Sequence, residues 1–259
     1  MQSAVLATAI EIQKEAAATA LRHFRTGIDI DLKSDESPVT AADLAIERDA
    51  RDRIHDAFPD HEILGEEYGA GDLSKDHVWV IDPIDGTRSF VSGHPAFGFL
   101  LAYLERGRNR CSIISMPALD EVFIGQAARG ATLNGKPVRT SDKTRLSDAI
   151  LYINEGEKLL AHEPDVLAGL TQAGHTRRFA YDCYPHAMLA AGFVDCVVDY
   201  DLKPFDFLPL AGVIEAAGGI ITDWDGKPLD FGSDGRVVSA ATPKLHAALL
   251  AILSSGKRP

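Results

Sequence analysis

Residues 77–87 read HVWVIDPIDGT, an apolar run that ends in two aspartates, a glycine and a threonine. A carboxylate inside a strand faces a packed core and is costly unless it is paired or bound to a metal. At the carboxyl end of a strand it faces the crevice where α/β proteins bind ligands, and Asp82 follows a predicted buried strand. Pro83 fixes φ, and Gly86 lets the backbone approach a ligand closely. Asp85 is near enough in sequence to share a cation with Asp82, although Asp, Pro and Gly also form ordinary turns.

Other acidic residues stand at the ends of predicted elements. Glu66 and Glu67 follow the short predicted strand 62–65, and Asp206 stands at the start of a predicted helix. Each alone is more often a helix cap or a solvated loop residue. The nine histidines form no HxH or HxxxH pair. A set of hard oxygen donors without His or Cys indicates magnesium.

The residues after the two aspartates point to phosphate. The Thr87 hydroxyl and the amides of Gly86 and Thr87 would form an anion-binding turn beside the metal. Divalent metals at such a turn can neutralise a phosphate monoester, activate a water and stabilise the leaving oxygen. The chain has no GxxxxGK[ST] loop. Hydrolysis is therefore favoured over kinase chemistry.

Composition excludes several classes of protein. The 259 residues carry a net charge of −12 without a basic cluster, which disfavours nucleic-acid binding. No apolar run approaches the ~20 residues needed to cross a bilayer, and residues 1–24 are typical of an amphipathic helix rather than a secretory signal. The cysteines, Cys111, Cys183 and Cys196, form no CxxC pair. We expect reduced thiols in a cytoplasmic protein that has no membrane contact.

The pattern along the chain predicts stacked layers of helices and strands. Thr40-Ala-Ala-Asp43 has the form of a capping box that starts the second helix. The predicted elements are helices over 1–24 and 40–58, strands over 62–65, 77–82, 97–105, 111–116 and 121–127, a hairpin turn at 134–135, and then a strand near 150, a helix over 163–173, a strand over 176–180, a helix over 184–191, a strand over 194–199, a helix over 205–217, a strand over 219–223 and a helix from about 242. We expect one domain with subdomains of about 1–140 and 141–259 around one cleft.

These motifs together resemble the inositol monophosphatase family of Mg²⁺-dependent, lithium-sensitive phosphatases. The resemblance covers nearly the whole chain and is carried by SPVTAAD (37–43), GEE (65–67), DPIDGT (82–87) and Asp206, which precedes AGVIEAAGGIITDWDGKPL (211–229). It implies an α+β fold, a layered αβαβα sandwich of the inositol monophosphatase type. It also implies a small phosphate monoester as substrate and, commonly, a homodimer.

The resemblance implies a role for each matching residue. It assigns two or three Mg²⁺ ions to Glu66, Asp82, the carbonyl of Ile84, Asp85 and Asp206. Thr87 and Glu66 would orient and deprotonate the attacking water, and Asp43 would hydrogen-bond the threonine. The predicted substrate contacts are Asp85, Gly86, Thr87, Asp182 and Asp199.

Departures from the family pattern point to one branch. Phe205-Asp206 stands where the family commonly has Trp-Asp, and residues 180–195, AYDCYPHAMLAAGFVD, replace a stretch rich in small residues. With 82–98 and 201–210, this segment is similar to the histidinol-phosphate phosphatase branch. Asp182 would add a carboxylate suited to a cationic amino alcohol, or it would simply cap the following helix.

Three functions remain open at this point. The favoured one is hydrolysis of L-histidinol phosphate to L-histidinol and phosphate. The second is a broader inositol-1-phosphate or sugar-alcohol monophosphatase, and the third is a regulatory binding protein, against which the complete set of predicted metal ligands argues. Residues 33–38, KSDESP, form a polar loop that we expect to close over the site.

Overall fold

Two helices, a run of antiparallel strands and a mixed series of strands and helices follow one another in the computed structural model, which describes residues 2–26, 30–32 and 38–255. The helices are α1 (Gln2–His23), α2 (Ala41–Ala57), α3 (Thr87–Val91), α4 (Gly156–His162), α5 (Pro164–Gln172), α6 (Tyr184–Ala190), α7 (Pro204–Ala216) and α8 (Pro243–Ser255). The strands are β1 (Ile30–Leu32), β2 (Pro38–Thr40), β3 (Glu62–Gly65), β4 (Gly69–Ala70), β5 (His77–Asp85), β6 (Gly98–Glu105), β7 (Arg108–Met116), β8 (Glu121–Gln126), β9 (Gly130–Leu133), β10 (Lys136–Val138), β11 (Ile150–Asn154), β12 (Thr176–Ala180), β13 (Cys196–Asp199), β14 (Ile220–Asp223) and β15 (Val237–Ala240).

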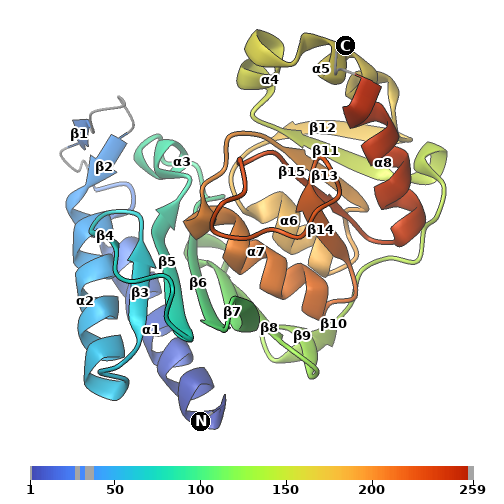
Figure 1. Ribbon diagram of the computed structural model, residues 1–259. Coiled ribbons are helices and arrows are strands. Elements are labelled where there is room, and N and C mark those ends of the chain that lie inside the picture. The colour runs from blue at the N-terminus through green and yellow to red at the C-terminus, as the bar shows by residue number, and fades with distance from the viewer. Residues whose placement is uncertain (1, 27–29, 33–37, 256–259) are drawn as a thin grey trace.

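Layers of helix and sheet alternate across the molecule (Figure 1). Helices α1 and α2 cover one face of an eight-stranded sheet, and α6 and α7 lie between that sheet and a five-stranded one. Helices α4, α5 and α8 form the other outer layer. This arrangement confirms the predicted αβαβα sandwich.

Each sheet is built from one stretch of the chain. The larger has the order β10-β9-β8-β7-β6-β5-β3-β4, and the smaller has the order β12-β11-β13-β15-β14. Pairing is antiparallel except where β3 meets β5 and where β11 meets β12 and β13. The predicted subdomain boundary near residue 140 falls in the connection between β10 and β11, and the division into subdomains stays a prediction.

Strand β5 lies inside the larger sheet and is buried on both faces. Trp79 and Ile81 pack into the core beneath α1 and α2, whereas Val78 and Val80 pack into the core that faces α6 and α7. This alternation follows from the two-residue period of a strand. The apolar run before Asp82 therefore anchors the acidic motif from both sides.

The end of β5 differs from the prediction. The sequence predicts that the strand ends at Asp82, but β5 continues to Asp85 with a register shift in its pairing with β6. Asp82 pairs with Leu100 and Asp85 with Gly98, so β5 carries one extra residue. Pro83 has no N–H to donate, and such bulges tolerate proline and re-aim side chains near active sites.

Helix α7 is apolar on nearly all sides because it lies between the two sheets. Its residues 207–214 are all buried, as expected for a helix in a central layer. The helix approaches β8 so closely that a Cβ on Gly125 would lie 2.5 Å from the Gly212 carbonyl oxygen and 2.6 Å from the Val213 Cα. Glycine at 125 thus sets the depth at which α7 sits.

A few other elements differ from the sequence prediction. The helix predicted over 163–173 is α5, and a separate helix α4 precedes it because Pro164 starts a new helix at its first position. The β1–β2 pairing, α3 and β15 have no counterpart among the predicted elements. The predicted closing loop lies outside the described residues at 33–37. Over the part of the chain that the structure describes, no helix is long and apolar enough to cross a membrane.

Gly125→Ala should lower the free energy of unfolding by about 1–3 kcal/mol, because the added methyl group would meet backbone atoms of α7 that cannot rotate away. Denaturant unfolding followed by circular dichroism measures this. Gly232→Ala is the matched control, since the nearest atom to its new Cβ is an Asp230 carboxylate oxygen at an ordinary 3.4 Å. Equal effects of the two substitutions would contradict the packing argument.

Candidate active site

Three carboxylates from both halves of the chain meet at the end of β5. Asp82 and Asp85 come from β5, and Asp206 comes from the first turn of α7. One carboxylate oxygen of each lies within 4.8 Å of those of the other two. Asp82 and Asp85 are buried, and Asp206 is half-buried as a residue with its carboxylate in the buried cluster. The predicted ligands Asp82, Asp85 and Asp206 are thus brought together.

Burial and mutual repulsion dominate the electrostatics of this cluster. Burial raises the pKa of Asp82 well above its usual range, and the charges of Glu66, Asp85 and Asp206 raise it further. The pKa of Asp85 is raised well above its usual range by burial, then by Asp182 and Asp206. Burial also raises the pKa of Asp206 to about 7. Ionising all three carboxylates of the cluster therefore costs considerable free energy.

This donor set fits a hard divalent cation such as Mg²⁺. The Asp82 Oδ1 atom is buried and has no hydrogen-bond partner among the described residues. An unsatisfied buried carboxylate oxygen is unfavourable, and a cation would satisfy it while removing the repulsion between neighbours.

Backbone amides from the second half of the chain hold two of the three carboxylates. The Cys183 amide donates to Asp85 Oδ2 at 2.6 Å. The Lys203 amide donates to Asp206 Oδ2 at 2.7 Å, as the first turn of a capped helix requires. Each bond fixes one oxygen of its carboxylate in place.

Glu66 lies beside the cluster rather than inside it. It stands in the turn after β3, where its amide donates to the Ile81 carbonyl of β5 at 3.2 Å. The charge of Glu66 and a side-chain hydrogen bond with it raise the pKa of Asp82, and its charge also raises the pKa of Asp43 and Asp206. Glu66, itself a predicted metal ligand, is therefore close to two of the other predicted ligands, Asp82 and Asp206, and to Asp43.

The turn after β5 brings the predicted phosphate donors next to the cluster. Gly86 has φ of 79°, a left-handed conformation that favours glycine, and it caps α3. The Thr87 hydroxyl donates to the Ile84 carbonyl at 3.1 Å. The carbonyl that the family resemblance assigns to a metal thus has the threonine hydroxyl beside it.

Asp43 accepts hydrogen bonds from Thr40, whereas its predicted partner is Thr87. Its Oδ2 accepts hydrogen bonds from the Thr40 amide at 2.8 Å and the Thr40 hydroxyl at 2.5 Å, which confirms the capping box. Its Oδ1 is buried and has no hydrogen-bond partner in the ranges that the structure describes, and burial raises the pKa of Asp43 to about 6. In the structure the Thr87 hydroxyl donates to the Ile84 carbonyl. A hydrogen bond from Thr87 to Asp43 stays a prediction, and it requires the Thr87 hydroxyl to turn away from Ile84.

Asp182 lies against the phosphate-binding turn. A Cβ on Gly86 would lie 2.4 Å from the Asp182 Cγ, and the Ser89 hydroxyl donates to Asp182 Oδ2 at 2.5 Å. Burial raises the pKa of Asp182 to about 6. The alternative that Asp182 caps the next helix is wrong, because α6 has Cys183 as its N-cap and, among the described residues, no side-chain hydrogen bond caps that end.

Asp199 is buried and tied to Asp182 through one side chain. It accepts hydrogen bonds from Asn154 Nδ2 at 2.7 Å, His186 Nε2 at 3.1 Å and the Tyr200 amide at 2.9 Å. Asn154 Nδ2 also donates to the Asp182 carbonyl at 3.0 Å. Sequence reasoning missed both partners of Asp199. Asn154 belongs to no motif and is 45 residues from Asp199, and His186 lies within the quoted segment 180–195 but gives no signal of its own there. Contact between Asp199 and a substrate stays a prediction.

Comparisons with known proteins identify phosphatases that are similar to this chain in sequence and fold. The model of the inositol monophosphatase family matches residues 1–258. The chain is 42% identical over 203 residues to the chloroplastic bifunctional phosphatase IMPL2 of Arabidopsis thaliana, covering 78% of this chain but 59% of that protein. It is 33% identical over 258 residues to a histidinol-phosphatase of Chlorobaculum parvum, covering 98% of each. A solved inositol monophosphatase from Zymomonas mobilis aligns with a TM-score of 0.86 and 32% identity, covering 95% of this chain and 96% of that one.

Without metal, the protein should lose stability as the pH rises from about 4 to about 7. The pKa values of Asp43 (about 6) and Asp206 (about 7) exceed their ordinary 3.8, so the folded state binds protons that the unfolded state releases in this window. At pH 8, Mg²⁺ at about 100 times its dissociation constant should raise the melting temperature by roughly 5–10 °C. The rise should shrink at pH 5, where protons compete with the cation.

Scanning calorimetry with EDTA or with Mg²⁺ at constant ionic strength measures both effects. Asp82→Asn serves as the control: it should stabilise the metal-free protein by removing buried charge, and it should abolish most of the Mg²⁺ effect. A Mg²⁺ effect of equal size at pH 5 and pH 8, or one that survives Asp82→Asn, would place the cation elsewhere.

Proposed function

Because the chain belongs to the inositol monophosphatase family, we propose that it is a Mg²⁺-dependent phosphatase that hydrolyses L-histidinol phosphate to L-histidinol and inorganic phosphate, a step of histidine biosynthesis. The observation that carries the choice of substrate is the Asp182 carboxylate against Gly86. The full-length likeness to a histidinol-phosphatase supports it.

The chemistry of the substrate explains why that position matters. In histidinol phosphate the protonated amine stands on the carbon next to the CH₂–O–P group, so a cation lies close to the phosphate. A carboxylate in contact with the phosphate-binding turn suits such a cation, whereas a polyol needs hydroxyl partners. The Ser89 hydroxyl favours the ionised form of Asp182 and fixes its direction.

The residues of the chain would divide the work of hydrolysis as follows. The amides of Gly86 and Thr87 donate to the phosphate oxygens. Thr87 and Glu66 orient the attacking water in line with the bond to be broken, and Glu66 accepts its proton. Asp43 turns the Thr87 hydroxyl once that hydroxyl leaves the Ile84 carbonyl. Two or three Mg²⁺ ions, held by the five predicted ligands, would supply charge neutralisation for the phosphate and lower the pKa of the water.

A second activity has support of its own. The Zymomonas mobilis inositol monophosphatase has 32% identity to this chain, so an inositol-1-phosphate or broad sugar-alcohol monophosphatase is the alternative. A regulatory binding protein is less favoured, because binding alone gives no reason to bury three repelling carboxylates at one point. Asp82→Asn should then abolish the cellular role; a role that survives this substitution would not be catalytic.

The remaining expectations belong to the same proposal. A cytoplasmic location, a homodimer and sensitivity to lithium stay predictions. The net charge of −12 still disfavours a nucleic-acid partner.

Phosphate release with Mg²⁺ from histidinol phosphate, inositol 1-phosphate and a neutral sugar-alcohol phosphate tests the proposal. We expect the highest kcat/KM for histidinol phosphate. A preference for inositol 1-phosphate would favour the second activity, and no release from any ester would exclude the phosphatase proposal.

Asp182→Asn should lower kcat/KM for histidinol phosphate about 10- to 100-fold, because a hydrogen bond to a charged group is worth about 1.5–3 kcal/mol. It should change kcat/KM for inositol 1-phosphate less than about threefold. Asp76→Asn is the matched control, since Asp76 is exposed and pairs with Arg106 away from the cluster. Equal losses for both substrates would mean that Asp182 supports the turn without selecting the alcohol.

A further inference from the structure

Helix α2 carries two fully buried carboxylates on one face. Asp43 and Glu47 are four residues apart, a spacing that brings side chains together on a helix, and both are 0% exposed. Asp43 has a predicted role at the site. Glu47 has none, and a buried carboxylate is costly unless its partners justify it.

The partners of Glu47 are the backbone amides that directly follow Glu66. The Glu67 amide donates to Glu47 Oε2 at 2.6 Å, and the Tyr68 amide donates to Oε1 at 3.1 Å. The Glu66 amide itself donates to the Ile81 carbonyl of β5. Three consecutive amides of the turn are therefore fixed, one by β5 and two by Glu47.

Two further residues complete this arrangement. Arg51 Nε donates to Glu47 Oε1 at 2.8 Å, and its Nη2 donates to the Gly69 carbonyl at 2.5 Å, so Arg51 joins Glu47 to the far end of the turn. Gly65 leaves room for the carboxylate, because a Cβ there would lie 2.0 Å from Glu47 Oε1. The turn with Glu66 is thus held by a charged pair on α2.

We propose that Glu47, paired with Arg51, is a positioning residue that fixes the direction of Glu66 toward Asp82 and the predicted metal site. The inference rests on the proposed function, since it gives Glu66 a task for which its position matters. An apolar side chain would fill the same volume without burying charge, so packing alone does not account for a carboxylate here. Partners that orient a metal ligand commonly matter about 10- to 100-fold in affinity or activity.

Glu47→Gln keeps the shape of the side chain but replaces one acceptor oxygen with a donor that opposes a turn amide. It should weaken Mn²⁺ binding, measured by titration calorimetry without substrate, about tenfold and should lower kcat at least as much. In a Glu66→Gln background, the same substitution should weaken Mn²⁺ binding less than about twofold, because Glu47 acts through Glu66. Equal weakening in both backgrounds, or none in either, would overturn the proposal.

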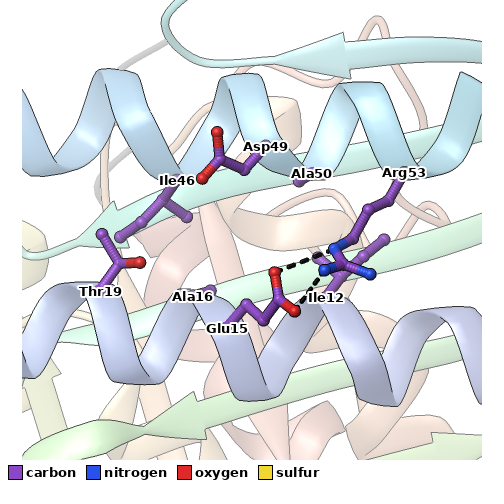
Figure 2. Close-up of a pocket in the computed structure, with 8 residues that line it drawn as sticks. All are labelled: Ile12, Glu15, Ala16, Thr19, Ile46, Asp49, Ala50 and Arg53. Atoms are coloured by element: carbon purple, nitrogen blue, oxygen red, sulfur yellow. Dashed lines mark hydrogen bonds and ion pairs between the residues drawn. The ribbon is translucent and has the colours of Figure 1, made fainter.

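The chain offers a control in a second Glu–Arg pair that also involves α2. Glu15 of α1 pairs with Arg53 of α2, as Figure 2 shows, but this pair lines a small pocket between α1 and α2 rather than the turn that carries Glu66. Glu15→Gln should leave Mn²⁺ binding and kcat unchanged. If Glu47→Gln does not fold, Arg51→Lys is compared with Arg53→Lys. Weaker Mn²⁺ binding by Arg51→Lys alone, at equal melting temperatures of the two variants, supports the proposal. Equal Mn²⁺ binding by the two variants overturns it.

The outcomes separate this inference from the proposed function. A wild-type chain that binds Mn²⁺ but releases no phosphate would end the proposed function, and the double-substitution cycle would still decide whether Glu47 acts through Glu66. Hydrogen exchange of the turn peptide adds a reading without metal. The Glu67 and Tyr68 amides should exchange faster in Glu47→Gln than in Glu15→Gln, and equal exchange would show that Glu47 does not hold the turn.

Discussion

The repulsion among three carboxylates whose oxygens lie within 4.8 Å of one another is the constraint on which the rest of this structure depends. Asp82, Asp85 and Asp206 would separate if their elements could move. They cannot, because β5 is buried between two cores and α7 is buried between two sheets. The fold thus supplies the rigidity that keeps like charges together, and a divalent cation would supply the opposite charge.

The surroundings of the cluster are arranged to fix carboxylates without neutralising them. The Cys183 amide holds one oxygen of Asp85 and the Lys203 amide holds one oxygen of Asp206, and over the described part of the chain Asp82 Oδ1 has no hydrogen-bond partner. Helix α2 contributes Asp43 and the Glu47–Arg51 pair, and Glu47 bonds the turn that carries Glu66. Fixed acceptors that point at one place are what a metal-dependent phosphatase needs before its ligand arrives.

Local sequence was sufficient to predict much of this arrangement. The αβαβα layers, the capping box at Thr40 and the meeting of Asp82, Asp85 and Asp206 could be predicted from patterns, spacing and the family resemblance. The continuation of β5 to Asp85 could not, because it depends on how β6 accommodates the proline. Contacts across the chain were equally hidden: Asp85 and Cys183 are 98 residues apart, and Glu47 meets a turn 20 residues away. Such contacts depend on how sheets and helices pack, which no local motif records.

The most direct measurement is an anomalous difference map from crystals of the wild-type chain soaked in Mn²⁺, with phosphate present. The account predicts at least one strong peak bounded by Asp82, Asp85 and Asp206, with phosphate density beside Gly86 and Thr87. A map that has Mn²⁺ peaks elsewhere and none among these three carboxylates, at concentrations where the protein hydrolyses its substrate, would contradict it.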